Sequence, residues 1–288
     1  MKNIVSRIAA IEKEIKETPC HKGTEHHLGQ LRARLAKLKR RLEVSKKTGG
    51  SYGFALKKFG DATVVLLGPP SVGKSTLLNQ LTGARSRVEP WPFTTLKVIP
   101  GMMKYKGAQI QLLDLPGIIS GAHQGRGRGQ EVFSVARTAD LLLLVIDPQN
   151  MTKRDLVFKE LEKSEVNVPT LLVVNKSDLL KNKKFRQLGR KAVFISAKTG
   201  FNLEKLKEII WQELKLMRVY LKPKGRRPDF AEPLILKKGE RVVDAFKKVF
   251  PHQKRPGQVL LWGHSARFPG QQVSLSHRLK DGDILTFY

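Results

Sequence analysis

The octapeptide GPPSVGKS, from Gly68 to Ser75, constrains the fold of this chain more than any other stretch. It fits the pattern G-x-x-x-x-G-K-[ST] and stands between an apolar run, ATVVLLG, and a helix-like segment, KSTLLNQLTG. In a strand–loop–helix unit of this kind, backbone N–H groups of the loop point at phosphate oxygens, and the positive end of the helix attracts the same anion. The sequence therefore predicts a phosphate-binding loop at the carboxyl end of a buried strand.

Apolar runs and helix-like segments alternate after this loop. The further strand-like runs are AQIQLLDLPG, ADLLLLVIDP, PTLLVVNKSD and KAVFISAKTG, and helices are predicted over 153–164 and 203–214. Runs that are apolar on both faces must be covered on both faces. The pattern therefore favours an α/β fold with a mainly parallel sheet, helices on both faces, and ligands at the carboxyl ends of the strands.

The chain divides by pattern into five segments. Residues 1–48 carry an isoleucine stripe and a leucine stripe at spacings of three and four, which predict a basic helical hairpin. Residues 49–60 are predicted to be a linker, and 61–222 a nucleotide-binding domain. A second linker is predicted over 223–232. The last segment, 233–288, is predicted to be a small α+β module, with strands in LILKKG, QVLLWG, QQVSL and DILTFY and a helix in ERVVDAFKKVF.

The charge of the chain points to a polyanionic partner. Lys and Arg number 54 against 25 Asp and Glu, a net charge of +29. Such an excess favours nucleic acid, although a solubility role and an anionic membrane surface are alternatives. The sequence has no run of about 20 apolar residues, so we expect a cytoplasmic protein without stable membrane insertion. Cys20 is the only cysteine, which excludes internal disulfides.

The phosphate-binding loop predicts the roles of several residues. Lys74 is expected to neutralise the β- and γ-phosphates, and the Ser75 hydroxyl and Asp114 to bind Mg²⁺. Thr95, in PFTTL, is expected to reach the metal, and Gly117 to bring its amide close to the γ-phosphate. Lys74, Thr95 and Gly117 are thus the catalytic candidates, and Ser75, Thr95 and Asp114 the metal ligands. The predicted phosphate-loop contacts are Gly68, Pro69, Pro70, Ser71, Val72, Gly73, Lys74, Ser75 and Thr76.

The stretch NKSD predicts which base is bound. The Asp178 carboxylate can accept from N1–H and the exocyclic amine of guanine, whereas adenine offers no such donor pair and would leave the carboxylate unpaired. Asn175 is expected at the opposite edge of the base, and the Lys176 stem over its ring. The stretch SAK, which also contributes to the predicted site, consists of Ser196, Ala197 and Lys198. Its Ala197 amide is expected to reach guanine O6.

With these residues assembled, the sequence resembles the Obg-related GTPases and, among them, the branch of developmentally regulated GTP-binding proteins. The resemblance extends over nearly the whole chain. It rests on TEHHLGQLRARLAKLKRRL, GPPSVGKSTLLNQLTG, WPFTTL, YKGAQIQLLDLPGIISGAHQGRGRGQEVFSVARTADL, NKSD, SAKTG, RVYLKPKGRRPDF and LLWGHSARFPGQQVSLSHRLKDGDIL. It implies GTP hydrolysis to GDP and a last segment that is a TGS domain, a ubiquitin-like β-grasp module associated with RNA and the ribosome. Members of that branch usually carry a ribosomal-protein-like insert before the guanine motif. Since 137–175 has room only for a strand, a helix and a strand, we expect that insert to be absent.

The group that positions the attacking water is not fixed by the sequence. Ile118 stands where Ras-type GTPases carry a glutamine, so orientation must come from backbone near Thr95, from His123 or Gln124, or from a partner. We therefore predict slow intrinsic hydrolysis that a partner stimulates. Whether a monovalent cation such as K⁺ also binds at the phosphate loop stays open, because Ser71 replaces the asparagine often associated with potassium use.

The sequence thus predicts a monomeric GTPase switch acting on the ribosome or structured RNA, in translation or ribosome assembly. The resemblance implies a dedicated stabilising protein as a further partner. Two alternatives stay open: an RNA-binding adaptor in which the nucleotide is only a structural ligand, and a GTPase of the membrane surface. The candidate RNA-contacting residues of the last segment are Lys237, Lys238, Lys247, Lys248 and Arg267.

Overall fold

The computed structural model describes residues 59–83, 89–90, 97–116, 129–148, 153–179 and 192–288. The predicted helical hairpin and nearly all of the linker after it therefore lie outside the described residues. The chain divides into two units, Met1–Gly53 and Phe54–Tyr288. The described residues all belong to the second unit.

The larger sheet of this unit has seven strands in the order β2-β3-β4-β1-β5-β6-β7. The pairs β1–β4, β1–β5, β5–β6 and β6–β7 are parallel, and β2–β3 and β3–β4 are antiparallel. The mainly parallel sheet that the sequence predicts is therefore confirmed. The strands are β1 (Ala62–Leu67), β2 (Glu89–Pro90), β3 (Lys97–Tyr105), β4 (Ala108–Asp114), β5 (Leu141–Ile146), β6 (Thr170–Val174) and β7 (Ala192–Phe194).

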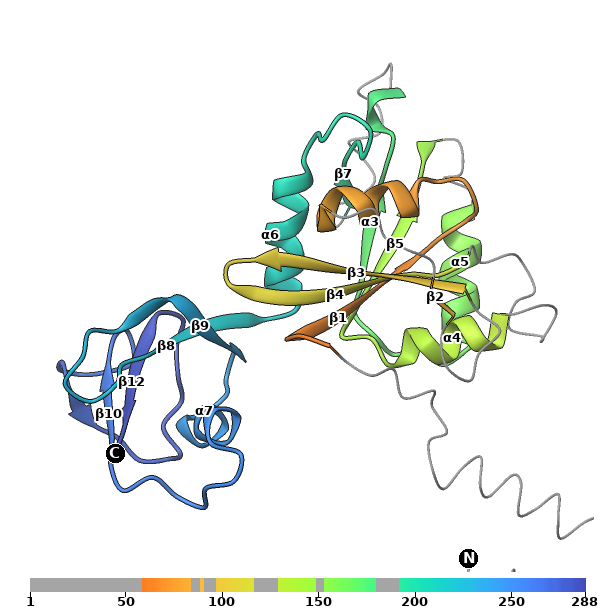
Figure 1. Cartoon of the computed structure of the whole chain (residues 1–288). Helices are drawn as coiled ribbons and strands as arrows, with labels where there is room; N and C mark the ends of the chain where they lie inside the picture. Colours follow the sequence, from red (N-terminus) through yellow and green to blue (C-terminus); the bar gives the residue numbers. More distant parts are fainter. Residues whose placement is uncertain (1–58, 84–88, 91–96, 117–128, 149–152, 180–191) are drawn as a thin grey trace, which may run out of the picture. The chain divides into compact units, whose positions relative to one another are not determined.

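Helices cover both faces of this sheet (Figure 1). Every residue of β1 and of β5 is buried, and neighbouring side chains point to opposite sides: Leu66 joins the core beneath α3 and α6, and Leu67 the core beneath α4 and α5. An apolar run without alternation is what such a doubly covered strand requires. The helices are α3 (Lys74–Thr82), α4 (Gly129–Arg137), α5 (Lys153–Lys163) and α6 (Leu203–Glu213), so the two predicted helices are confirmed to within one residue.

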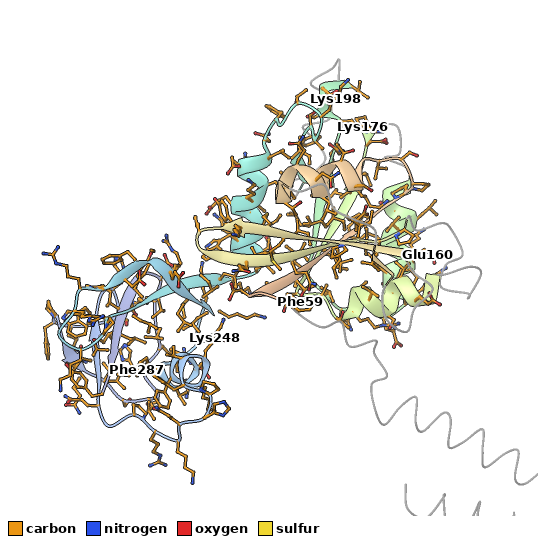
Figure 2. All side chains as sticks on the ribbon, viewed as in Figure 1. Phe59, Glu160, Lys176, Lys198, Lys248 and Phe287 are labelled. Carbon is orange, nitrogen blue, oxygen red and sulfur yellow. The ribbon has the colours of Figure 1, made fainter. Side chains whose placement is uncertain are left out.

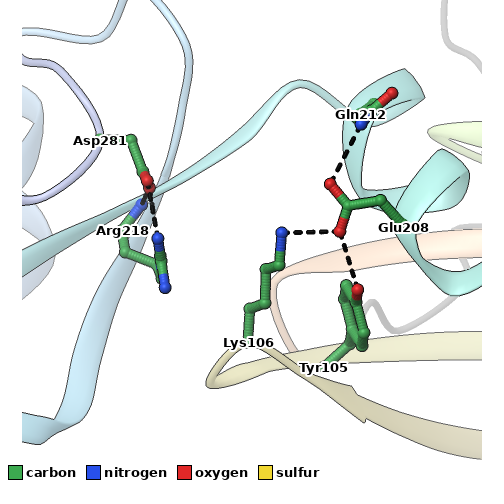
Figure 3. A network of polar contacts seen from close by, with 6 residues as sticks. All are labelled: Tyr105, Lys106, Glu208, Gln212, Arg218 and Asp281. Carbon is green, nitrogen blue, oxygen red and sulfur yellow. Dashed lines mark hydrogen bonds and ion pairs between the residues drawn. The ribbon is translucent and has the colours of Figure 1, made fainter. Parts of the chain in front are cut away.

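A polar network fixes the turn between β3 and β4 against α6 (Figure 3). One carboxylate oxygen of Glu208 accepts from the Tyr105 hydroxyl at 2.7 Å and from the Lys106 ammonium at 2.6 Å, and the other accepts from Gln212 at 3.0 Å. These donors, Lys106 first, lower the pKa of Glu208 to about 2. Partial burial and the bond to Glu208 raise the pKa of Tyr105 to about 12. The ring of Trp211 packs edge-on against Tyr105, with centroids 6.4 Å apart.

The second sheet has five strands in the order β11-β10-β12-β8-β9, with β12 and β8 parallel and the other pairs antiparallel. Its strands are β8 (Leu216–Leu221), β9 (Asp229–Lys237), β10 (Val259–Trp262), β11 (Gln271–Gln272) and β12 (Asp283–Phe287). Helix α7 (Val242–Val249) covers one face, where Phe246 contacts Phe287 at a centroid distance of 5.4 Å. Figure 2 shows Phe287 on this side of the sheet, toward α7. The small α+β module is therefore confirmed.

Strand β8 belongs to this second sheet, although the sequence pattern had placed it in the segment 61–222. It follows α6 after a short turn, but its strand partners β9 and β12 lie later in the chain, β12 more than 60 residues on. Arg218, in the middle of β8, donates from its guanidinium to both carboxylate oxygens of Asp281, at 2.8 and 3.2 Å (Figure 3). Such a two-point contact holds β8 to the loop before β12.

Candidate nucleotide-binding site

The predicted site residues that the structure describes lie at one end of the larger sheet, in loops, at the start of α3 and at the end of β4. Strands β1, β4, β6 and β7 point the same way, so the segments that follow them meet at their carboxyl ends. These segments are the GPPSVGKS loop, Asp114, the NKSD stretch and the SAK stretch. This is the edge at which a parallel α/β sheet binds its ligands.

Two glycines allow the phosphate loop to pass close to its neighbours. Gly68 has φ +147°, and a Cβ there would lie 2.0 Å from the carbonyl oxygen of Val145 in β5. Gly73 has φ +90°, and a Cβ there would lie 2.5 Å from the side-chain nitrogen of Asn175. Both positions therefore require glycine for conformation and for space. The loop is thus packed directly against β5 and against the NKSD stretch.

Lys74 is a buried cation held by the loop itself. Its side chain donates from Nζ to the carbonyl oxygens of Gly68 and Pro69 at 3.3 and 3.0 Å, and the residue is only 7% exposed. Burial lowers the pKa of Lys74, and the nearby Asp114 carboxylate opposes that change. An ammonium group shielded from water interacts more strongly with an anion than one in bulk solvent. The loop therefore presents a concentrated positive charge beside its backbone N–H groups.

Ser75 and Asp114 form an oxygen pair that suits a magnesium ion. The Ser75 hydroxyl donates to Asp114 Oδ2 at 2.5 Å. Asp114 Oδ1 is buried and has no hydrogen-bond partner among the described residues. Burial raises the pKa of Asp114, while the hydrogen bond from Ser75 and the charge of Lys74 oppose that change. Mg²⁺ prefers hard oxygen ligands and keeps sites for phosphate oxygens, so this donor set fits it.

Asn175 joins three loops. Its side-chain amide donates to the Val72 carbonyl at 2.9 Å, and its carbonyl accepts from the Ala197 N–H at 2.9 Å. Asn175 is 2% exposed. The sequence prediction directed Asn175 and the Ala197 amide to the base, whereas the structure bonds them to each other. Their contacts with guanine stay a prediction. Through its two hydrogen bonds, Asn175 also links the phosphate loop, the NKSD stretch and the SAK stretch, and we call this link a brace.

Lys176 forms a second brace, through an acid that the sequence reasoning missed. Its ammonium donates to the Ser71 carbonyl at 2.8 Å and to Asp147 Oδ2 at 2.9 Å. Asp147 directly follows β5 and is 2% exposed. The only sequence signal was its place at the end of LLLLVID, where a polar residue terminates a buried strand. Neighbouring residues of NKSD thus bind neighbouring carbonyls of the phosphate loop.

Asp178 is exposed and ready to accept hydrogen bonds. It lies in the 3-10 turn Ser177–Leu179, called η3, and a hydrogen bond with Ser196 is the largest cause of its lowered pKa. The positive charges of Lys198 and Lys176 lower that pKa further. Figure 2 shows Lys176 and Lys198 at the same end of the domain. The carboxylate is therefore ionised at neutral pH, as recognition of a paired N–H donor requires.

Thr95 and Gly117 lie outside the described residues, as do Ile118, His123 and Gln124. Their predicted roles in metal binding, catalysis and water positioning therefore stay predictions. Among the helices that the structure describes, none has both the length and the apolar character needed to cross a membrane.

Comparison with protein families matches three parts of the chain. Residues 63–176 match the family "50S ribosome-binding GTPase", residues 137–216 the "C-terminal region of MMR_HSR1 domain", and residues 217–288 the "TGS domain". The last match begins one residue after the start of β8, in agreement with the place of that strand in the second sheet.

Whole-chain relatives come from archaea and eukaryotes. A protein of Methanocaldococcus jannaschii described as "Uncharacterized GTP-binding protein MJ1326" is 39% identical, with 98% of this chain and 92% of the relative aligned. Human "Developmentally-regulated GTP-binding protein 2" is 35% identical, with 98% of each aligned. "Ribosome-interacting GTPase 1" of Saccharomyces cerevisiae is 35% identical, with 99% of each aligned. The alignments run over 359 to 369 positions against 288 residues here, so the relatives carry residues without a counterpart in this chain.

Proposed function

Because this chain belongs to the family of developmentally regulated GTP-binding proteins and contains a GTPase domain, we propose that it is a GTP-hydrolysing switch whose nucleotide state controls its contact with the ribosome or with structured RNA. One observation carries the proposal. Consecutive side chains of NKSD bind consecutive carbonyls of the phosphate loop, which joins a base-reading segment and a phosphate-binding segment into one site.

At the phosphate end, the roles follow from the chemistry of the side chains. Lys74 donates to the oxygens of the β- and γ-phosphates, and the loop N–H groups donate to the same oxygens. Ser75, Asp114 and Thr95 would hold Mg²⁺, and the amide of Gly117 would contact the γ-phosphate. When bound, Mg²⁺ would neutralise negative charge on the phosphates.

At the base end, Asp178 accepts from the paired N–H donors of guanine. Its hydrogen bond with Ser196 supports this role, because it fixes the orientation of an otherwise exposed carboxylate. The stem of Lys176 covers the ring, and Asn175 and the Ala197 amide line the opposite edge. Adenine leaves the carboxylate without a donor, so we expect GTP to be bound far more tightly than ATP.

Three observations support the ribosome or RNA as the partner. The net charge of +29 suits a polyanion, the chain matches a TGS domain, and one relative is described as ribosome-interacting. We place the protein in the cytoplasm as a monomer, aided by a stabilising protein, with K⁺ as an open second cation. We further propose that the nucleotide-binding domain ends in the turn before β8, and that the insert usual in relatives is absent between residues 137 and 175.

Phosphate release under multiple turnover, with and without ribosomes, tests the proposal. We expect slow release by the protein alone and a faster rate with ribosomes, in KCl more than in NaCl if the monovalent cation takes part. Equal rates with and without ribosomes would refute the switch. If Lys74→Ala abolishes hydrolysis but leaves ribosome and RNA binding intact, the adaptor alternative is correct. Co-sedimentation with anionic vesicles at matched salt tests the membrane-surface alternative.

A further inference from the structure

One face of the five-stranded sheet carries aromatic rings instead of a helix. Val219, Leu261 and Leu285 point toward α7 and are buried in its core. The residues that alternate with them point to the other face. Among these, Tyr220, Ile284 and Trp262 stand opposite one another across β8, β12 and β10, and all three are only half-buried. We call this surface the open face of the sheet.

Lysine ammonium groups lie directly beside these rings. Lys222 Nζ is 4.4 Å from the centroid of Trp262, and Lys224 Nζ is 5.2 Å from that of Tyr288. At the edge of the face, the ring of Phe230 meets Tyr220 at a centroid distance of 5.0 Å and an angle of 65°. Since buried aromatic side chains are the norm in a small domain, exposed rings paired with cations require a separate explanation.

Two of the rings are exposed far beyond what packing requires. Phe230 is 61% exposed and Tyr288 is 45% exposed. Neither contributes to the core beneath α7. Large apolar groups at such positions keep much of their surface in contact with water, so they are available to a ligand that covers them.

The charge around the open face is strongly positive. The stretch KPKGRR, residues 222–227, places four cations within six residues without an acid, and Arg226 and Arg227 are exposed. Residues 217–288 contain fifteen Lys and Arg against six Asp and Glu. The ligand therefore carries negative charge at short intervals along its length, as a phosphate backbone does.

We propose that the open face binds an unpaired RNA strand, with bases stacked on Trp262, Phe230 and Tyr288 and phosphates held by Lys222, Lys224 and the arginines after them. Flat rings alternating with cations suit the alternation of bases and phosphates along a single strand. A duplex keeps its bases stacked inside and offers only phosphates. An acidic peptide satisfies the cations but offers no regularly spaced flat groups to stack on the rings. The inference rests on the proposed function, because it names the surface through which that function reaches RNA.

Fluorescence anisotropy of the full chain with a labelled single strand of about ten nucleotides tests this surface. We expect Trp262→Leu to weaken binding by about 5- to 100-fold, because each stacked base contributes on that scale. Phe230→Ala with Tyr288→Ala, at two exposed positions that leave the core intact, is expected to weaken it likewise. Lys222→Ala with Lys224→Ala should reduce the slope of log K against log salt by about two.

The matched control removes two lysines elsewhere in the same domain. Lys238→Ala with Lys247→Ala has the same net charge change. The sequence named both lysines as candidate RNA contacts, but Lys247 lies on the helix that covers the opposite face, so this pair also tests that prediction. We expect this control variant to show no loss of single-strand binding comparable to that of the ring variants. Equal binding by wild type and both ring variants overturns the inference, as does tighter binding of a duplex, an acidic peptide or anionic vesicles than of the single strand.

Ribosome pelleting separates this inference from the proposed function. If wild type neither pellets with ribosomes nor hydrolyses GTP faster with them, the proposed function fails. If wild type does both and the ring variants match it in pelleting and in single-strand binding, only the open face is refuted. We expect the intrinsic GTPase rate of every variant to equal that of wild type.

Discussion

The Asn175→Ala variant tests whether the nucleotide site is held together by hydrogen bonds between loops. The change removes one donor and one acceptor, and leaves the Val72 carbonyl and the Ala197 N–H without partners at positions 0% and 1% exposed. An unpaired buried backbone group costs about 1–3 kcal/mol. Allowing for partial access of water, we expect the free energy of GTP binding to become less favourable by roughly 2–4 kcal/mol. This change corresponds to about 30- to 1,000-fold weaker GTP binding.

Isothermal titration with GTP measures this loss, and Gln111→Ala is its control. Gln111 is also 2% exposed and also makes two side-chain hydrogen bonds, both accepted by its carbonyl oxygen from Phe59 N–H and the Thr63 hydroxyl, near the start of β1 and away from the nucleotide loops. We expect Gln111→Ala to lower the melting temperature and to leave GTP affinity within about threefold of wild type. An Asn175→Ala variant that binds GTP as well as Gln111→Ala does would refute the brace.

Four further changes probe separate parts of the domain. Asp147→Asn removes the charge opposite the NKSD lysine and should weaken GTP binding by about fivefold, measured by titration. Ser75→Ala should raise the Mg²⁺ concentration needed for half-maximal nucleotide binding by about 10-fold or more, and an unchanged requirement would exclude this hydroxyl from the metal site. Asp178→Ala should reduce the preference for GTP over ATP while pyrophosphate still binds; retained preference would show that another group reads the base. Glu208 has a pKa lowered to about 2 from its ordinary 4.5, so its stabilising effect is complete above pH 4.5 and lost as the pH falls toward 2. The difference in melting temperature between wild type and Glu208→Gln should close over that range, and a gap that persists at low pH would contradict the network.

The parts of the fold that follow from local pattern were predictable. A central parallel strand must be apolar on both faces, and the run LLLLVI of β5 meets this requirement at every position. The phosphate loop was predictable because its glycines have no substitute: a Cβ at Gly68 or Gly73 would overlap a neighbouring atom. At these two positions glycine is required by both the positive φ and the lack of space for a side chain.

Features that depend on contacts between distant segments were not predictable. Asp147 reaches Lys176 only because β5 lies beside β6, and a single sequence does not give the order of strands. Strand β8 was assigned to the first domain because the segment that completes its sheet, β12, is near the end of the chain. The lysine beside Trp262 is 40 residues away in sequence, so the open face becomes visible only after the sheet has formed.

The braces also bear on how base recognition and phosphate binding depend on each other. Asn175 and Lys176 donate hydrogen bonds to the carbonyls of Val72 and Ser71, so the NKSD stretch supports the structure of the phosphate loop. Asp178 lies two residues further on, exposed and outside these contacts. Damage to the braces should therefore weaken every ligand that uses the phosphate loop, including pyrophosphate, whereas damage to Asp178 should change only the choice of base. A site divided in this way can alter its base preference without losing its hold on phosphate, because the two properties reside in different side chains of one short segment.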